Sequence, residues 1–356
     1  MMITILIFLG ILAVLILAHE AGHFATAKAF GVKVDEFGLG FPPRLIGVRR
    51  GETLYSLNAV PLGGFTKMAG EEDPEVPRSL ASKSVGTRLI VLSAGSIMNA
   101  LLPILLFFIA FMVPHDMVIE PTVVKIVSPG SPAARAGIEP GDTLLGINGK
   151  LINNFSEFQR YVHLNLGKEI TILVEHSDAT TEETQVIPRW RPPENEGAIG
   201  IERDIELALS NRTIVSQSEP FWKAIPMGAG EYIETFVLFK NEILMWFIGT
   251  TTPQVTGPVG IAELTGEVAK AGISPLLEFT GFISINLAII NILPLPALDG
   301  GRIVFVLLEW VRRGKRVSPR TEGLVHAIGF ATLIAAIVAI TYQDVIRIIA
   351  GESLIP

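Results

Sequence analysis

Two histidines and a glutamate stand close together in the string His19-Glu20-Ala21-Gly22-His23. On a helix, residues four apart lie on the same face, so both imidazoles can bind one metal ion. A carboxylate beside such a pair can take a proton from the water that zinc proteases use to hydrolyse peptide bonds. The spacing therefore predicts a zinc site with His19 and His23 as ligands and Glu20 as the proton acceptor.

This motif follows an uninterrupted apolar run. Residues 1–18 contain no charge and one hydroxyl, that of Thr4, and with Ala21 and Gly22 the run is long enough to cross a bilayer. Ionisable side chains at that depth are costly and usually functional, which weakens the alternative of a surface glutamate between two histidines. A removable signal peptide is the other alternative, but no Lys or Arg precedes the run and it exceeds a usual signal core.

The third zinc ligand has to come from elsewhere in the chain. A catalytic zinc usually takes three protein ligands and a water, and without cysteine the choice is histidine or carboxylate. Asp299 is the best candidate, because Pro294 and Pro296 break the apolar helix just before it. Irregular backbone at membrane depth is tolerated where it is buried in protein or lines a wet cavity. A simple Asp-Gly turn at the membrane exit is the alternative.

Composition places these motifs in a membrane protein. The 356 residues are 49% hydrophobic and 18% charged, and the mean hydropathy is +0.49. The net charge is -7 and the sequence has no basic, aromatic-rich stripe, so it lacks the positively charged surface that nucleic-acid binding needs. Hydropathy predicts four spans, which makes the lipid bilayer a partner. The apolar segments are residues 1–22, Leu89–Val113, Leu276–Leu298 and Gly323–Ile340.

Lysines and arginines predict the orientation. They gather between the first and second spans and between the third and fourth, so both segments are expected on the cytoplasmic side. Both termini and residues 114–275 then lie outside, in a multi-pass protein of the cell (inner) membrane. The first and third spans run inward, which brings His19, His23 and Asp299 to the same, cytoplasmic end.

The outer segment begins with a region of soluble character at residues 114–207. It holds strand patterns at 122–127, 169–175 and 183–187 and a polar helix pattern at 156–164. The string Ser131-Pro-Ala-Ala-Arg-Ala-Gly-Ile-Glu-Pro-Gly-Asp142 resembles the bacterial type of PDZ domain. A generic small β-domain, whose glycines and prolines only make turns, is the alternative.

Two further segments complete the organisation into parts 1–113, 114–207, 208–275 and 276–356. Residues 208–275 are amphipathic and rich in aromatics, which suits helices on the outer membrane surface or the packing face of a soluble extension. Residues 31–86 are rich in turns around a strand at Thr53–Val60, which predicts a membrane-associated β-hairpin. The expected fold class is an α-helical polytopic membrane protein with four transmembrane helices, this membrane-associated hairpin and an inserted extracytoplasmic PDZ domain of mixed α/β structure.

The chain resembles the site-2 protease family of intramembrane zinc metalloproteases, in its bacterial regulator-of-sigma-E protease type. The resemblance is carried by His-Glu-Ala-Gly-His on the first span, Asn-x-x-Pro-x-Pro-x-x-Asp-Gly on the third and one PDZ domain between them. It extends to Phe37–Gly40, Pro61–Phe65 and Gly257–Ile261 and covers nearly the whole chain. Some members carry two PDZ domains, so gating by a tandem pair is not expected here.

The resemblance implies the roles of the site residues. His19, His23 and Asp299 would bind one Zn²⁺ per chain, and Glu20 would act as general base and acid. Asn291 would hold the substrate backbone near the scissile bond, with an interhelical hydrogen bond as the alternative. His326, alone on the fourth span, is expected to be a bundle contact and not a ligand.

The implied substrates are single-pass membrane proteins, such as anti-sigma factors or remnant signal peptides, after a first cut outside by a site-1 protease. We expect the hairpin strand to pair with the unwound substrate and the PDZ domain to screen substrates by size or by an exposed C-terminus. The pairing residues would be Thr53, Leu54, Tyr55, Ser56, Leu57 and Asn58. A metal-ion transporter and a catalytically silent PDZ scaffold are the competing functions.

Overall fold

The computed structural model describes residues 2–194, 196–252 and 255–350. Backbone contacts divide the chain into two compact units, one of residues 1–110 and 255–356 and one of residues 111–254. The first unit is mainly helical and carries the predicted metal ligands. The second is rich in strands.

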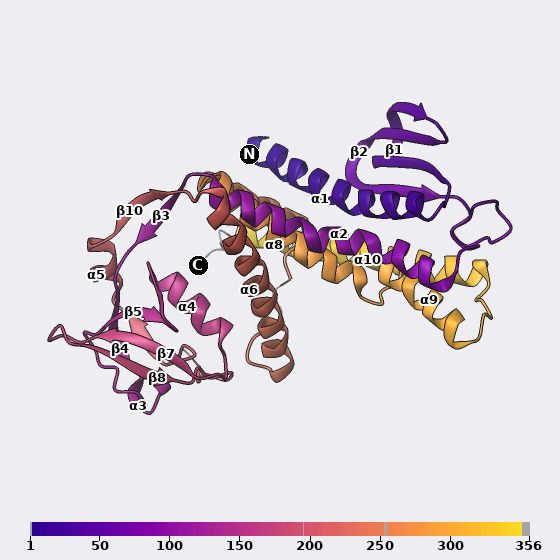
Figure 1. The fold of residues 1–356 in the computed structure, drawn as a ribbon. Helices are drawn as coiled ribbons and strands as arrows, with labels where there is room; N and C mark the ends of the chain where they lie inside the picture. The colour runs from indigo at the N-terminus through magenta and orange to yellow at the C-terminus, as the bar shows by residue number, and fades with distance from the viewer. Residues whose placement is uncertain (1, 195, 253–254, 351–356) are drawn as a thin grey trace. The chain divides into compact units, whose positions relative to one another are not determined.

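Within its described residues, the first unit consists of helices and two long strands (Figure 1). Its elements are α1 (Met2–Ala29), β1 (Val34–Arg50), β2 (Thr53–Met68), α2 (Val85–Met112, which leads into the second unit), α7 (Pro258–Lys270), α8 (Ile273–Ile292), α9 (Asp299–Val311) and α10 (Pro319–Ile349). In the described part of the chain, four helices are long and apolar enough to cross a membrane, namely α1, α2, α8 and α10. Each of the four coincides with a predicted apolar segment.

Helices α1 and α2 approach each other closely at Gly22. A Cβ at this position would overlap the carbonyl oxygen of Ala94 on α2 and lie 2.8 Å from its carbonyl carbon. Glycine at position 22 therefore lets the two backbones pack at short range, as small residues do between membrane helices. Helix α1 ends at Ala29, and Gly31 takes the left-handed conformation (φ 68°) that turns the chain toward β1.

Strands β1 and β2 are both bent and together form a sheet four segments wide. The pairing sets residues 44–50 beside 53–58, residues 54–60 also beside 36–41, and residues 34–39 also beside 64–68. Gly40 (φ 78°) and Gly63 (φ 96°) adopt the left-handed conformation near the bends. Among the described residues, the outer segments of this sheet are 44–50 and 63–68, and segment 53–58 lies inside it.

A charged cluster ties this sheet to the end of α1. Glu52, in the turn between β1 and β2, contacts Lys28 Nζ at 2.6 Å and Arg78 Nη1 at 2.7 Å. Hydrogen bonds from Arg78 and Lys28 lower the pKa of the Glu52 carboxyl to about 2. The sheet is therefore anchored next to the segment of α1 that holds the histidines (Figure 1).

Helix α8 stops earlier than the hydropathy pattern suggested. The predicted span runs to Leu298, whereas the helix ends at Ile292 because Pro294 and Pro296 cannot continue it. The chain passes through residues 293–298 without regular structure and begins α9 at Asp299. A Cβ at Gly300 would lie 2.5 Å from the carbonyl oxygen of Ile292, so this glycine lets α9 start against the end of α8.

The second unit contains an antiparallel sheet of six strands in the order β8-β7-β5-β4-β9, with β6 beside β5, and a separate antiparallel β10–β3 pair. Its elements are β3 (His115–Ile119), β4 (Thr122–Val127), α3 (Pro132–Arg135), β5 (Thr143–Ile147), β6 (Lys150–Leu151), α4 (Phe155–Leu164), β7 (Ile170–Glu175), β8 (Thr181–Val186), β9 (Ile201–Arg203), α5 (Ile205–Ser210), β10 (Thr213–Gln217) and α6 (Phe221–Ile248). The strands and the helix predicted from the sequence are present. Phe158 and Val162 of α4 pack into an apolar core with the strands of the larger sheet.

Candidate metal centre

Three donor atoms from two distant helices form a nearly equilateral triangle. Nε2 of His19 and Nε2 of His23 are 3.2 Å apart, and each lies 3.1 Å from Oδ2 of Asp299. Bonds of about 2.0–2.1 Å in a tetrahedral zinc site place neighbouring donors about 3.3 Å apart. Two imidazoles and one carboxylate are also a usual ligand set for catalytic zinc. The residues present therefore fit a zinc ion with its fourth position open.

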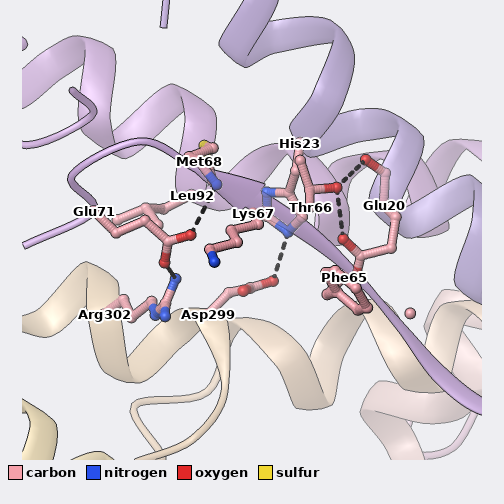
Figure 2. Close-up of a pocket in the computed structure, with 11 residues that line it drawn as sticks. Glu20, His23, Phe65, Thr66, Lys67, Met68, Glu71, Leu92, Asp299 and Arg302 are labelled. Atoms are coloured by element: carbon pink, nitrogen blue, oxygen red, sulfur yellow. Dashed lines mark hydrogen bonds and ion pairs between the residues drawn. The ribbon is translucent and has the colours of Figure 1, made fainter. Parts of the chain in front are cut away.

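A backbone carbonyl orients the second histidine. His23 is buried, and its Nδ1 donates a hydrogen bond to the carbonyl oxygen of Val91 on α2 at 2.8 Å. Figure 2 shows that Nε2 of His23 faces Asp299. With the proton on Nδ1, this Nε2 atom carries the lone pair that a metal needs. Helix α2 thus sets the tautomer of a candidate ligand on α1.

Gly95 of α2 leaves room for both imidazoles. A Cβ at this position would overlap Nε2 of His23 and would lie 2.6 Å and 2.7 Å from Cε1 and Nε2 of His19. Any side chain larger than hydrogen would push the imidazoles out of the triangle. Gly95 is therefore a structural requirement of the site, and it does not offer a ligand atom.

The carboxylate of Glu20 is held by the sheet. Thr66 of β2 donates a hydrogen bond from Oγ1 to Oε2 of Glu20 at 2.8 Å, and the carbonyl oxygen of Glu20 lies at 3.1 Å (Figure 2). A hydroxyl has one proton, so the shorter contact to the charged oxygen is preferred. This leaves Oε1 of Glu20 available for a proton from a reacting group.

Glu20, His23 and Asp299 line one cavity of about 310 Å³. Its walls also include five consecutive residues of β2, Gly64 to Met68, together with Glu71, Leu92 and Arg302. Side chains of a strand alternate between faces, so five consecutive residues can border one cavity only where the edge of the strand faces it. The 63–68 segment therefore presents its edge to the candidate site.

The six strand residues proposed for substrate pairing lie elsewhere. Residues 54–57 are paired on both sides, with 46–49 and with 36–39, so they have no free edge in this sheet. Thr53 and Asn58, at the two ends of this stretch, pair on one side only, with Arg50 and Arg44. The 63–68 segment is the outer segment that reaches Glu20. The interior place of 53–58 follows from the second bend near Gly63, which returns the chain along the other side of 36–39.

Asn291 lies beside the triangle but does not border the cavity. Its side-chain nitrogen is 3.5 Å from Nδ1 of His19, at the last turn of α8. If Nε2 of His19 is the ligand atom, Nδ1 carries the proton and the amide oxygen of Asn291 is the group suited to accept it. The residue is thus placed to orient His19.

An ion pair joins the loop after β2 to α9 at the border of the cavity. Arg302, one turn beyond Asp299, donates to Glu71, and Oε1 of Glu71 accepts from the backbone nitrogen of Met68 at 3.1 Å (Figure 2). Because Met68 ends the strand that carries Thr66, this pair fixes α9 against the sheet.

Comparison with known proteins decides the family. The model described as Peptidase family M50 matches residues 7–336. The chain belongs to peptidase family M50. A protein of Clostridium acetobutylicum, named a candidate zinc metalloprotease, is 36% identical to this M50 peptidase over 335 residues, 94% of each chain. Zinc metalloprotease RasP of Oceanobacillus iheyensis is 27% identical over 438 residues, which cover 98% of this chain and 100% of the relative.

Among solved structures, the PDZ domain of the SdrC-like protein of Listeria monocytogenes is 24% identical and covers 25% of this chain and 93% of that one, with a TM-score of 0.22. Family membership confirms the resemblance seen in the sequence. This M50 peptidase is an intramembrane metalloprotease with zinc as its cofactor.

Two residues of the candidate metal centre were not expected from the sequence. Gly95 interrupts the apolar run of α2, which signals a close approach but does not say what approaches. Thr66 follows the Pro61–Phe65 motif directly, yet only the fold shows that its hydroxyl reaches Glu20.

Proposed function

We propose that this M50 peptidase hydrolyses peptide bonds within the transmembrane segments of single-pass membrane proteins. In this proposal His19, His23 and Asp299 hold the zinc ion, and Glu20 is the general base and acid. One observation supports it most directly. The three donor atoms lie 3.1–3.2 Å apart, and two of the residues that supply them, His23 and Asp299, line the same cavity as Glu20.

In this proposal the metal ligands, Glu20 and Thr66 have separate roles in peptide hydrolysis. Zinc held by such a donor set polarises a carbonyl and makes a water more acidic. Glu20 takes the proton of the attacking water on one carboxylate oxygen and returns it to the nitrogen of the leaving amine. Thr66 holds the other oxygen, so the carboxylate keeps one orientation through both transfers.

The substrate has to reach the site in extended form, because helical hydrogen bonds shield the scissile carbonyl. The outer edge of segment 63–68 supports pairing with such a strand, since five consecutive residues of β2 border the cavity. By the family motif Asn291 would hold the substrate backbone near the scissile bond, while its contact with Nδ1 of His19 supports a role in orienting that ligand. Thr53–Asn58 would then support the edge segments from inside the sheet and make no direct contact with the substrate backbone.

The same proposal covers the cellular setting. The four apolar helices cross the cell (inner) membrane, with the active site toward the cytoplasm and both termini outside. The chain is organised as parts 1–113, 114–207, 208–275 and 276–356. The second part is an extracytoplasmic PDZ domain that screens substrates by size or by a C-terminus. The substrates, anti-sigma factors or remnant signal peptides, arrive after a first cut by a site-1 protease.

Cleavage of a reporter with one transmembrane segment by the detergent-solubilised protein is the test. The unaltered protein should cut within the apolar segment, and Glu20→Gln should retain zinc while losing cleavage by a factor of about 10² or more. Persistent cleavage by Glu20→Gln would reject the base assignment. Zinc binding without cleavage of any single-span reporter would favour a silent scaffold, and zinc uptake into proteoliposomes would favour a transporter.

A further inference from the structure

The segment that delivers Asp299 has little structure of its own. Residues 293–298 link α8 to α9, and within them Ala297 has φ 76°, in the left-handed region that residues other than glycine rarely adopt. A strained conformation of this kind persists only where surrounding groups hold it. Asp299 comes two residues later, so what holds Ala297 also sets the direction of the carboxylate.

A histidine of α10 holds Ala297 in place. The backbone nitrogen of Ala297 donates a hydrogen bond to Nδ1 of His326 at 3.0 Å. Nδ1 must therefore carry a lone pair, which makes His326 neutral with its proton on Nε2. The ring of Phe305 from α9 lies 5.6 Å away, centroid to centroid, and limits rotation of the imidazole.

The second nitrogen of His326 shows why a histidine is needed here. Nε2 is buried and has no hydrogen-bond partner among the residues that the structure describes. A leucine or phenylalanine would fill the same space without burying an unpaired N–H, which is a costly arrangement. The acceptor at Nδ1 is the property that these apolar residues lack.

Gly329 gives the same helix a second contact with this segment. It lies one turn after His326, and a Cβ at Gly329 would overlap Cβ of Pro296 and lie 2.9 Å from the carbonyl oxygen of Pro296. Residues three apart on a helix share a face. One face of α10 therefore makes both contacts with the Pro296–Ala297 bend. His326 accepts the hydrogen bond from Ala297, and Gly329 leaves the space that Pro296 occupies.

We propose that His326 and Gly329 are positioning residues for Asp299, through which α10 sets the geometry of the zinc site without touching the metal. The inference rests on the proposed role of Asp299 as a ligand. Loss of the acceptor lets Ala297 leave the left-handed conformation, and a side chain at 329 displaces Pro296. Either change turns the carboxylate of Asp299 away from Nε2 of His19 and Nε2 of His23.

The experiment measures zinc itself, by its rate of transfer from the solubilised full-length protein to a chelator. His326→Leu should release zinc about 10-fold faster or more, the usual size of an outer-shell effect. His326→Asn, whose side-chain oxygen can replace Nδ1 as acceptor, should restore most of the retention. Leu324→Ala, at a side chain of α10 that is 60% exposed, is the control. Equal rates for His326→Leu and the unaltered protein, or for His326→Asn and His326→Leu, would overturn the acceptor role.

Gly329→Ala gives an independent measurement, matched by Gly323→Ala, where an added Cβ on the same helix meets nothing within 4 Å. Gly329→Ala should speed zinc release and shift the visible absorption bands of the cobalt(II)-substituted protein, and Gly323→Ala should do neither. Thermal unfolding of each variant separates a shifted ligand from a loss of fold. Asp299→Asn belongs in the same series. If it retains zinc normally, the ligand assignment itself fails. If it alone speeds release, only the positioning role of α10 fails.

Discussion

Gly95 of α2 lies so close to His23 of α1 that a Cβ at position 95 would overlap the Nε2 nitrogen. Helix α2 supplies no candidate ligand, but this contact places it against α1, which supplies His19 and His23. The packing of α1 on α2 is therefore part of the candidate metal centre, because the imidazoles can converge on Asp299 only while position 95 has no side chain.

The first prediction is that Gly95→Ala loses zinc and activity, although alanine favours a helix by about 1 kcal/mol. The added methyl group would displace Nε2 of His23 and the ring of His19. Zinc content after dialysis and reporter cleavage would check this. Gly86→Ala, where an added Cβ on the same helix meets nothing within 4 Å, should keep both. Full zinc content in Gly95→Ala would contradict the close contact.

Asp299→Asn should weaken zinc retention by about tenfold or more, equivalent to about 1.4 kcal/mol. The amide keeps the shape of the side chain but removes the negative charge that complements the metal. Equilibrium competition with a chelator measures the change. Zinc affinity equal to that of the unaltered protein would remove Asp299 from the ligand set.

Thr66→Val should lower the rate of cleavage about tenfold while leaving zinc bound. Valine matches threonine in shape but cannot donate to Oε2 of Glu20, and a hydrogen bond to a charged group is worth about 1.5 kcal/mol. Thr66→Ser retains the hydroxyl and should restore most of the rate. A serine variant no faster than the valine variant would show that the methyl group, and not the hydroxyl, matters at this position.

Crosslinking can decide which edge of the sheet receives the substrate. The chain has no cysteine, so a single introduced thiol reports one position. In the Glu20→Gln background, Lys67→Cys on the 63–68 segment should crosslink to a cysteine in the substrate span. Val48→Cys, 62% exposed on the other outer segment, should not. The reverse pattern would move substrate pairing to the 44–50 segment.

Acid should loosen the anchor of the sheet. The pKa of Glu52 is depressed to about 2 by Arg78 and Lys28, from an ordinary value of 4.5. The ion pairs therefore stabilise the fold above pH 4.5, and this contribution is lost as the pH falls from 4.5 toward 2. Thermal unfolding followed at pH 6 and pH 3 should show a smaller pH effect in Glu52→Gln than in the exposed control Glu75→Gln. An unchanged pH dependence in Glu52→Gln would argue against the anchor.

The sequence was informative where chemistry depends on local spacing. His19 and His23 share a helix face because they are four residues apart, and Pro294 and Pro296 mark the break that precedes Asp299. Hydropathy alone located the four long apolar helices found among the described residues, although the predicted third span extended past the end of α8 at Ile292. These features depend on residues that are close together in the sequence, so they can be predicted without knowing the fold.

Contacts between residues that are distant in the sequence could not be predicted from the sequence. The strand pattern at Thr53–Val60 was correct, but its place inside the sheet depends on how 36–41 and 44–50 pair around it. In the same way, the partners of Thr66 and His326 come from elements far away along the chain. A single strand pattern does not encode its register, so the free edge could only be located in the folded sheet.

The triangle of donor atoms has a consequence for biosynthesis. Its first two corners are made at the start of translation and its third 276 residues later, after the entire second unit. On the proposed ligand set, a nascent chain that ends before Asp299 has the two imidazoles without the carboxylate, so its metal site is incomplete. Metal binding by all three ligands would then require that α9 has been synthesised and has brought Asp299 to the two histidines.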